Sequence, residues 1–426
     1  MIKEPYLIVC RSTNHMLRAT RLIEKDYVYE LVPVPAEYGS VCNTAIRISR
    51  INLPTIKELL TNKKVMVEGY YAEQRRKFPG LLDALKLLRL SPPIVAIMGK
   101  TEQGLALERN ELVTLLAAEG DDMRAVFMAG DMMRKAVVGD VVDIRAVVEF
   151  SNYCSKNCCY CGLRKDNYNL GRYRMRPDEI IAIAKEMKAI GHHTIILQSG
   201  EDAWYTTEVM LEIIRGIKQE SNMRITLSIG GRTKEEYQLF REAGANNFLL
   251  KIETSNRARF SEIHPDDDYD LRLEQSKWLK ELGYITGSGN IVGLPKQTLE
   301  DLADDLILMK NTGIHMIGIG PFLPAKNTPL AETKPGDYEL SLKAVAVARI
   351  YLKNVFIPST TALATLDPDG LRRGLEVGAN TIMYNLTPPQ FQSEYAIYSE
   401  KAVIDLQKTV EAVVAAGRKV QSALKI

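Results

Sequence analysis

Apolar and polar positions repeat in a fixed order along residues 141–390, a short β-rich apolar run and then a longer amphipathic segment. Such runs are typical of buried strands, and apolar residues at helical spacing are typical of covering helices. The predicted strands are Asp143–Phe150, Thr194–Gln198, Ile225–Ile229, Phe248–Ile252, Thr286–Val292, Met316–Phe322, Val355–Thr361 and Thr381–Tyr384. The predicted helices between them are Pro177–Ile190, Thr207–Glu220, Lys234–Ala243, Leu271–Leu282, Thr298–Thr312 and Tyr338–Lys353.

This repeat predicts an α/β protein with a parallel sheet covered on both sides. Six strands would fit an open doubly wound sheet, whereas eight favour closure into a complete, TIM-type (β/α)8 barrel. The predicted barrel occupies residues 141–390, and residues 391–426 are expected to form a helix that caps it.

Residues 1–90 are expected to form a separate small α/β domain. The predicted elements are a strand at Tyr6–Cys10, a helix over Asn14–Lys25 capped by Ser12 or Thr13, and a strand at Val28–Val34. Cys10 ends its strand and is expected to be buried. A helix is also predicted within Glu37–Arg50, opened by Gly39 and Ser40, with Cys42 in its first turn. A helix N-terminus lowers the pKa of a thiol, so Cys42 is a candidate reactive thiol or, alternatively, a small buried residue.

Residues 91–140 are predicted to hold a linker and two helices before the barrel. Ser91, Pro92 and Pro93 indicate the linker, because prolines remove backbone donors and disfavour a helix before them. The helical patterns cover Thr101–Ala118 and Asp121–Val137.

Composition narrows the class of protein. Hydrophobic residues make up 46% of the chain and charged residues 25%, as in ordinary soluble domains. The net charge of +2 gives no indication of nucleic-acid or membrane binding, and no apolar run approaches the length of a membrane span. All six cysteines lie at or before position 161, with no sign of a disulfide framework. A cytoplasmic location with little oxygen is therefore expected.

The stretch Ser151–Met175 carries the most informative chemistry, because Cys154, Cys158 and Cys161 form a C-x3-C-x2-C pattern. Three thiolates on one loop can bind three irons of a cubane [4Fe-4S] cluster, which leaves the fourth iron open to a small chelating molecule. A structural zinc site would need a second pair of ligands, and a disulfide would need an oxidising compartment. Cys159 lies outside the pattern and is expected to pack or remain a bystander.

The cysteine pattern resembles that of the radical S-adenosylmethionine (SAM) superfamily. In that superfamily the amino and carboxylate groups of SAM occupy the open iron, and the reduced cluster cleaves SAM to a 5′-deoxyadenosyl radical. The resemblance implies a [4Fe-4S] cluster and SAM as cofactors, and it implies that Tyr160 lies against the adenine.

Polar residues follow the predicted strands, where a barrel places its active site. Gly200, Glu201 and Asp202 follow the second strand, and this carboxylate-bearing turn suits the amino group of a cluster-bound methionine. Glu253 ends the fourth strand, where an unpartnered carboxylate would be costly, so it is expected to face a polar ligand. Arg272 could bind a ligand carboxylate in forked geometry or lie on a solvated helix face.

A narrower resemblance covers residues from about Leu107 to Tyr398. The segments that carry it are IRAVVEFSNYCSKNCCYCGLRKDN, LGRYRM, ILQSGED, GLPKQT, GIGPFLPAKNTPLA, IPSTTA and GANTIMYNLTP. They resemble the HydE-type maturases of [FeFe]-hydrogenase, in the group that includes biotin synthase and methylornithine synthase. Residues 1–90 resemble small selenium or sulfur carrier-like domains through YLIVCRSTNHMLRATRLI and LVPVP.

The HydE resemblance implies roles for individual residues. Glu201 and Asp202 would lie near the methionine amine, Glu253 on the ribose or methionine, and Arg272 on the SAM carboxylate. Lys251, Thr360 and Thr361 would face the substrate.

The expected function is that of a radical SAM enzyme acting on a small anionic substrate, sulfur- or metal-bearing, in metallocofactor maturation. The expected partners are an electron donor such as ferredoxin or flavodoxin and a maturation partner protein. The alternatives are a small-molecule mutase, a sulfur-inserting enzyme, or a non-enzymatic sulfur or metallocofactor carrier that relies on the N-terminal domain and Cys42.

Overall fold

The computed structural model describes residues 4–24, 26–34, 38, 44–72 and 77–420. Its first unit is a four-stranded antiparallel sheet with the order β2-β3-β1-β4 and two helices. The bounds are β1 Pro5–Cys10, α1 Thr13–Ile23, β2 Tyr29–Pro33, β3 Thr44–Ser49, α2 Leu53–Asn62 and β4 Val67–Ala72. The Ser12 side chain caps α1 by accepting from the His15 amide at 3.3 Å. The predicted α/β unit is thus confirmed, and Cys10 is buried in its core.

The helix predicted within Glu37–Arg50 is wrong over its second half, because Thr44–Ser49 forms strand β3 between β2 and β1. Ala45, Ile46 and Ile48 are buried there, and pairing with β1 and β2 satisfies the backbone. Cys42 lies outside the described residues, so its role stays a prediction.

Four helices lead into the barrel, namely α3 Leu81–Leu85, α4 Pro92–Glu102, α5 Arg109–Leu116 and α6 Gly120–Val138. The linker prediction at Ser91–Pro93 is wrong, since the two prolines occupy the first turn of α4, where no amide partner is needed. The predicted helix Thr101–Ala118 is interrupted after Glu102, where Gly104 adopts a positive φ of 71°. Leu81 and Leu85 of α3 belong to the barrel's hydrophobic core, which begins at Phe78, and not to that of the first unit.

The remainder of the chain confirms the eight-strand prediction. The strands β5–β10 are parallel neighbours in chain order, and β12 pairs in parallel with both β5 and β11. Their bounds are β5 Val141–Ser151, β6 Thr194–Ser199, β7 Arg224–Ser228, β8 Asn247–Leu249, β9 Ile285–Val292, β10 Met316–Pro321, β11 Pro358–Ser359 and β12 Thr381–Asn385. Phe356 joins β10 to the chain entering β11, because its amide donates to His315 O and its carbonyl accepts from Ile317, both at 2.8 Å.

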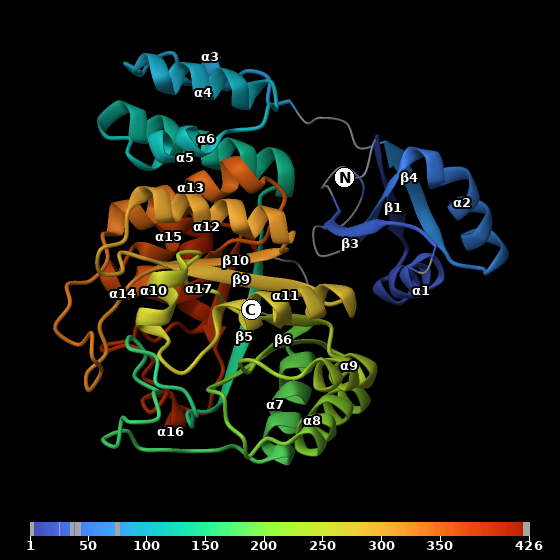
Figure 1. Cartoon of the computed structure of the whole chain (residues 1–426), viewed down its shortest axis with the longest axis vertical. Coiled ribbons are helices and arrows are strands. Elements are labelled where there is room, and N and C mark those ends of the chain that lie inside the picture. Colours follow the sequence, from blue (N-terminus) through green and yellow to red (C-terminus); the bar gives the residue numbers. More distant parts are fainter. Residues whose placement is uncertain (1–3, 25, 35–37, 39–43, 73–76, 421–426) are drawn as a thin grey trace.

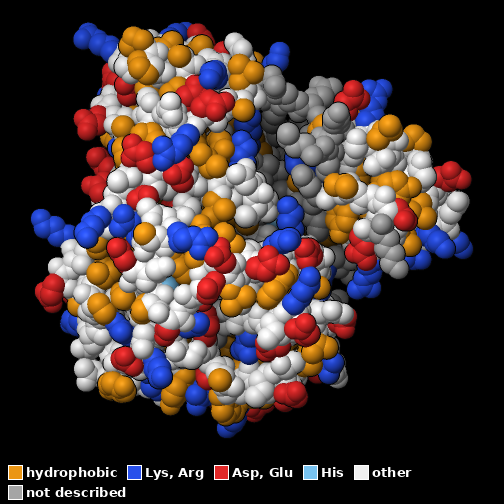
Figure 2. Space-filling view, viewed as in Figure 1, with side chains coloured by type: hydrophobic (Ala, Val, Ile, Leu, Met, Phe, Trp, Pro, Cys, Tyr) orange, Lys and Arg blue, Asp and Glu red, His pale blue; other side chains and the backbone are white. Residues whose placement is uncertain are grey.

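Helices cover the outside of this ring (Figure 1). They are α7 Pro177–Ala189, α8 Thr207–Glu220, α9 Lys234–Ala243, α11 Tyr269–Glu281, α12 Leu299–Thr312, α13 Tyr338–Leu352 and α15 Gly370–Glu376. Two further short helices, α10 Arg257–Ile263 and α14 Thr361–Leu366, follow β8 and β11. Acidic and basic side chains are interspersed on the face shown in Figure 2, as the small net charge leads one to expect. No described helix combines the length and the apolar character that crossing a bilayer requires.

The capping helix predicted over residues 391–426 is wrong. The tail holds a short α16 at Pro389–Gln392, an irregular run, α17 at Leu406–Ala415 and β13 at Lys419–Val420. Helix α17 packs against α15 and β12 and so takes the position of the eighth outer helix. Strand β13 pairs with the start of β5. Residues 393–405 remain irregular because their backbone bonds go to other parts of the chain, including Ile397 O to Gly162 and Ile404 O to Asn385, both at 2.9 Å.

The inside of the barrel is unusually open along β9 and β10. Bulky residues fill most such barrels, but glycines occupy positions 287, 289, 318 and 320 here. A Cβ on Gly289 would lie 2.2 Å from the carbonyl oxygen of Gly318, and one on Gly320 would lie 3.1 Å from Thr360 Oγ1. Larger residues would displace strand β10 or fill the interior, so the glycines preserve an internal space.

We predict that deleting residues 1–76 leaves the barrel folded, because the two hydrophobic cores divide between Tyr71 and Phe78. Deletion of residues 1–90 should be far more damaging, since it also removes the fully buried Leu81 and Leu85. Each buried leucine lost costs about 2–5 kcal/mol. Circular dichroism melting of both truncated proteins measures the difference, and equal stability would place the boundary nearer residue 90.

Candidate functional site

The cysteine loop directly follows β5 and brings three thiols together at the carboxyl end of the barrel. The pKa of Cys158 is raised by burial and by the charges of Cys161 and Cys154. Burial and Cys154 likewise raise the pKa of Cys161 to about 12. The charge of Cys154 thus acts on both other thiols, and a positively charged metal centre beside them would stabilise the ionised form.

Cys159 is oriented differently from the other three. Its thiol donates to the carbonyl oxygen of Glu262 at 3.4 Å, and the charges that act on its pKa belong to Arg164 and Asp266. This placement agrees with its exclusion from the ligand set.

The donor set fits a cluster better than a single ion. Among the described residues, no three His, Cys, Asp or Glu side chains converge closely enough to hold one metal ion. In a cubane each thiolate binds a different iron, so the sulfurs need to surround a larger volume. Three neighbouring but separated thiols, Cys154, Cys158 and Cys161, meet that requirement.

The turn after β6 packs directly on the cysteine loop. A Cβ on Gly200 would lie 2.2 Å from Tyr153 O and 2.7 Å from Cys154 Cβ, so only glycine fits without displacement. The Glu201 amide donates to Cys154 Sγ at 3.4 Å, and the Glu201 carbonyl accepts from the Ser155 amide at 2.9 Å. The backbone that approaches Gly200 most closely is therefore that of the cysteine loop.

A charged network lies next to these thiols. Arg272 is buried; it pairs with Asp267, and its guanidinium lies 3.6 Å from Glu201 Oε1. Lys156 lies 3.9 Å from Glu201 and 3.5 Å from Asp267. Burial raises the pKa of Glu201, although Arg272 and Lys156 act to lower it. The Nε of Arg272 is buried without a hydrogen-bond partner among the described residues. The network thus presents cationic and carboxylate groups side by side, so it can bind both the carboxylate and the ammonium group of a zwitterionic ligand.

Asp202 has partners outside this network, and its predicted contact with the methionine amine stays a prediction. Arg174 binds its two carboxylate oxygens at 2.7 and 3.0 Å, and Ser151 Oγ donates to it at 2.7 Å. Glu201 lies instead beside Arg272 and Lys156, so the two neighbouring carboxylates have different partners. Asp202 instead fastens the segment after the cysteine loop to β6.

Glu253 lies just after β8 and has an uncommon backbone conformation. Its φ is +63°, which is costly for a residue with a side chain. Hydrogen bonds to Gly289 O at 3.0 Å and from the Ile291 amide at 3.1 Å fix it against β9. Lys251 Nζ lies 3.0 Å from Glu253 Oε2, yet that buried oxygen has no hydrogen-bond partner among the described residues. This oxygen is thus charge-paired but not hydrogen-bonded, and it can accept from a ligand hydroxyl or amine.

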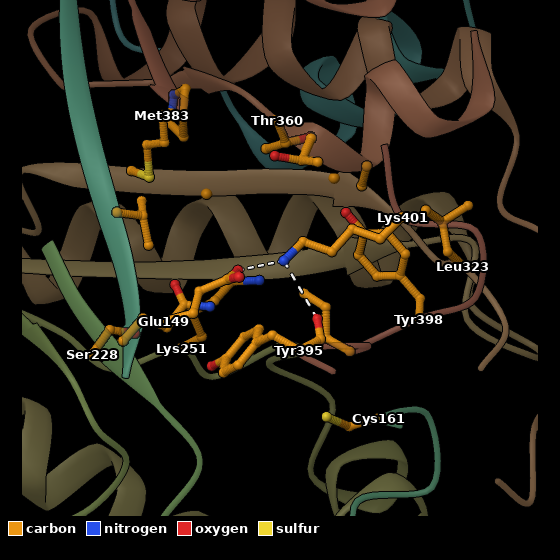
Figure 3. Close-up of a pocket in the computed structure, with 18 of the residues that line it drawn as sticks. Glu149, Cys161, Ser228, Lys251, Leu323, Thr360, Met383, Tyr395, Tyr398 and Lys401 are labelled. Atoms are coloured by element: carbon orange, nitrogen blue, oxygen red, sulfur yellow. Dashed lines mark hydrogen bonds and ion pairs between the residues drawn. The ribbon is translucent and has the colours of Figure 1, made fainter. Parts of the chain in front are cut away.

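A cavity of about 390 Å³ opens inside the barrel beside these residues (Figure 3). Among the predicted residues, its lining includes Cys154, Tyr160, Cys161, Gly200, Lys251, Glu253, Thr360 and Thr361. Tyr160 packs against Ile291 and Phe322, and its hydroxyl lies 3.1 Å from His264 Nε2. The structure thus brings the predicted adenine-facing and substrate-facing residues to one cavity.

Sequence reasoning missed the opposite wall of the cavity. Glu149 near the end of β5 is buried; it forms an ion pair with Lys401 and accepts from Asn385 Nδ2 at 2.8 Å. Tyr395 and Tyr398 line the cavity beside Lys401, as Figure 3 shows. Glu149 could have been found as a carboxylate inside an apolar strand, but no signal in the tail identifies the tyrosines or the lysine.

Comparison with known proteins agrees with this geometry. Residues 148–309 match the Radical SAM superfamily, and residues 5–72 match a Se/S carrier protein-like family. The chain is 47% identical over 280 residues to the [FeFe] hydrogenase maturase subunit HydE of Thermotoga maritima, covering 66% of this chain and 80% of the relative. It is 26% identical to 3-methylornithine synthase of Methanosarcina acetivorans, covering 74% and 89% of the two chains.

Solved structures show the same fold. The crystal structure of methylornithine synthase (PylB) is similar, with a TM-score of 0.69 at 26% identity, covering 76% of this chain and 97% of that one. The [FeFe]-hydrogenase maturase HydG also gives a TM-score of 0.69, at 20% identity over 81% and 79% of the two chains.

We predict that Cys158→Ser loses the iron–sulfur cluster and that Cys159→Ser retains it. The reason is that Cys158 is coupled to the two other thiols, whereas Cys159 points to a carbonyl. Iron and sulfide analysis after anaerobic reconstitution should give about four irons per chain for Cys159→Ser. Loss of iron from that variant would overturn the assignment.

The ion pair of Glu149 and Lys401 supplies a second prediction. Lys401→Met should lower the free energy of unfolding by about 3–5 kcal/mol, because it leaves a buried carboxylate unpaired. Glu149→Gln combined with Lys401→Met should recover most of that loss, since no charge remains. Urea denaturation of Lys401→Met, Glu149→Gln and the double variant measures this, and additive losses would show that the two side chains are not coupled.

Proposed function

The chain belongs to the radical SAM superfamily and is an enzyme of its HydE-like group, and we propose that it acts on a small anionic, sulfur- or metal-bearing substrate in metallocofactor maturation. The cofactors of this family are a [4Fe-4S] cluster and SAM. The observation that carries the proposal is the barrel cavity, which adjoins Cys154 and Cys161 and has a lysine–glutamate pair on each of two walls.

We propose that Cys154, Cys158 and Cys161 hold the cluster. When bound, the cluster supplies the electron that cleaves the sulfonium of SAM and gives the 5′-deoxyadenosyl radical. The amide that Glu201 directs at Cys154 Sγ would favour the thiolate, because a donor stabilises the charged form.

Four residues would position SAM. Arg272, with its unpartnered Nε, would bind the carboxylate, and Glu201 at 3.6 Å from Arg272 would bind the amine. Tyr160 would pack on the adenine, and Glu253 would accept from the ribose. Each role uses a side chain that is already fixed by its neighbours, so little ordering is needed on binding.

The cavity would receive the substrate. Lys251 and Lys401 present two ammonium groups, which suit an anion even though each is paired with a carboxylate. Thr360 and Thr361, at the N-terminus of α14, add hydroxyl groups to the cavity lining. Enclosure by the barrel excludes water from a radical, and the glycines of β9 and β10 leave room for more than a narrow ligand.

A radical SAM maturase needs an electron donor, for which we propose a low-potential protein such as ferredoxin or flavodoxin. The likeness to HydE supports a maturation partner protein that would receive the product.

The test is reductive cleavage of SAM. The anaerobically reconstituted chain with dithionite and SAM is expected to form 5′-deoxyadenosine, and Cys158→Ser is expected to form none. Lys251→Ala should keep SAM binding and slow only the turnover of the substrate. Chromatography of the products measures cleavage. A protein that holds a full cluster and SAM without releasing 5′-deoxyadenosine would favour the carrier function.

A further inference from the structure

Asp305 on α12 is a buried carboxylate with an unusual set of partners. Its side chain is fully buried. One oxygen accepts from the Ser255 amide at 2.5 Å and from Ser255 Oγ at 2.7 Å, and the other accepts from Asn290 Nδ2 at 2.8 Å. All three donors are neutral, and no ion pair to Asp305 is found within the described part of the chain.

This arrangement is costly and needs a reason. Burial raises the pKa of Asp305 to about 6 against the lowering by Ser255 and Asn290, and the nearby charge of Asp301 raises it further. Its neighbours on the same helix, Leu302 and Leu306, are apolar and buried, as packing against a barrel requires. An aliphatic residue at position 305 would avoid the desolvation of a charge. The carboxylate is therefore not explained by packing alone.

The two partners of Asp305 flank Glu253. Ser255 lies two residues after Glu253, and Asn290 forms a parallel bridge with it on β9. Asn290 also lines the cavity. Glu253 has a φ of +63°, which neighbouring contacts must maintain. Asp305 holds both sides of this strained residue from behind the sheet.

Hydrogen bonds also connect α12 to the cysteine loop through α10. Asn256, next to Ser255, caps α10 and donates to Asp301 at 2.8 Å. At the other end of α10, Ile263 O accepts from the Cys159 amide at 2.9 Å, and His264 meets Tyr160. The acidic face of α12 thus fixes one continuous segment that extends from Glu253 to the residues beside the cluster.

We propose that Asp305 is a positioning residue for SAM, acting through Ser255 and Asn290 to hold Glu253 in its ligand-binding conformation. The proposal rests on the SAM site proposed above. Asp305 touches neither the cavity nor the thiols, and its effect is on the geometry of the residues that do.

Three variants test this role. Asp305→Ala removes all three hydrogen bonds and should weaken SAM binding by about tenfold or more, since strained and oriented groups are released. Asp305→Asn can keep them, because Asn290 Oδ1 is buried without a partner among the described residues and can accept from the new amide after a flip. Asp304→Ala is the matched control, because Asp304 lies on the same helix but pairs with Arg109 at the surface.

The measurements are equilibrium dialysis of SAM with the reconstituted chain, iron content, and hydrogen exchange of the Ser255 amide. We expect unchanged iron in all variants, weak SAM binding and fast Ser255 exchange in Asp305→Ala only, and affinity within about threefold of the wild type for Asp305→Asn and Asp304→Ala.

Two outcomes would overturn the proposal. One is wild-type SAM affinity in Asp305→Ala despite faster exchange at Ser255, and the other is an equal loss of affinity in Asp304→Ala. If Asp305→Ala fails to fold, Ser255→Ala removes one bond and decides the question, since unchanged affinity there contradicts the proposal. A wild-type chain that does not bind SAM would refute the proposed SAM site itself, and not the support that Asp305 gives to Glu253.

Discussion

Closure of the strand ring is the constraint on which the rest of the molecule depends. The ring is completed by one residue, Phe356, whose backbone bonds tie the start of β10 to the chain entering β11. Once closed, eight carboxyl ends face the same opening, so residues as distant as Cys154, Glu253 and Thr360 come to one cavity. An open sheet with the same strands would spread these side chains along an edge and could not surround a ligand.

The cavity has a cost that the surrounding structure offsets. Glycines on β9 and β10 give up side-chain burial, Glu149 and Glu253 bring charge into the barrel, and Asp305 places a further buried carboxylate behind the sheet. Each carboxylate is stabilised in a different way: by Lys401, by Lys251, or by neutral donors alone. The interior of this barrel is thus arranged around polar groups, with the apolar packing moved outward to the interface between strands and helices.

Much of this organisation could be predicted from the sequence. The eight strands, the helices between them and the cysteine pattern follow from periodicity and spacing, which local physics controls. The strand at Thr44–Ser49 was predicted as a helix because Gly39 and Ser40 suggested a cap, while the pairing that decides it is tertiary. Glu201 and Asp202 are adjacent in sequence, and only the turn after β6 determines which of them faces the thiols. Lys401 lies 252 residues from Glu149, so no local pattern could connect them.

The irregular run at residues 393–405 has a consequence for modularity. It supplies Tyr395, Tyr398 and Lys401 to one wall of the chamber, while the cysteine loop and its charged neighbours come from residues 151–272. The lining of the cavity is thus encoded in stretches that lie far apart, since Lys251 belongs to the first of them and Thr360 and Lys401 lie well beyond it. Because Ile397 O in this run accepts from the Gly162 amide at 2.9 Å, exchanging the run would change one part of the cavity lining and the support of the cysteine loop together.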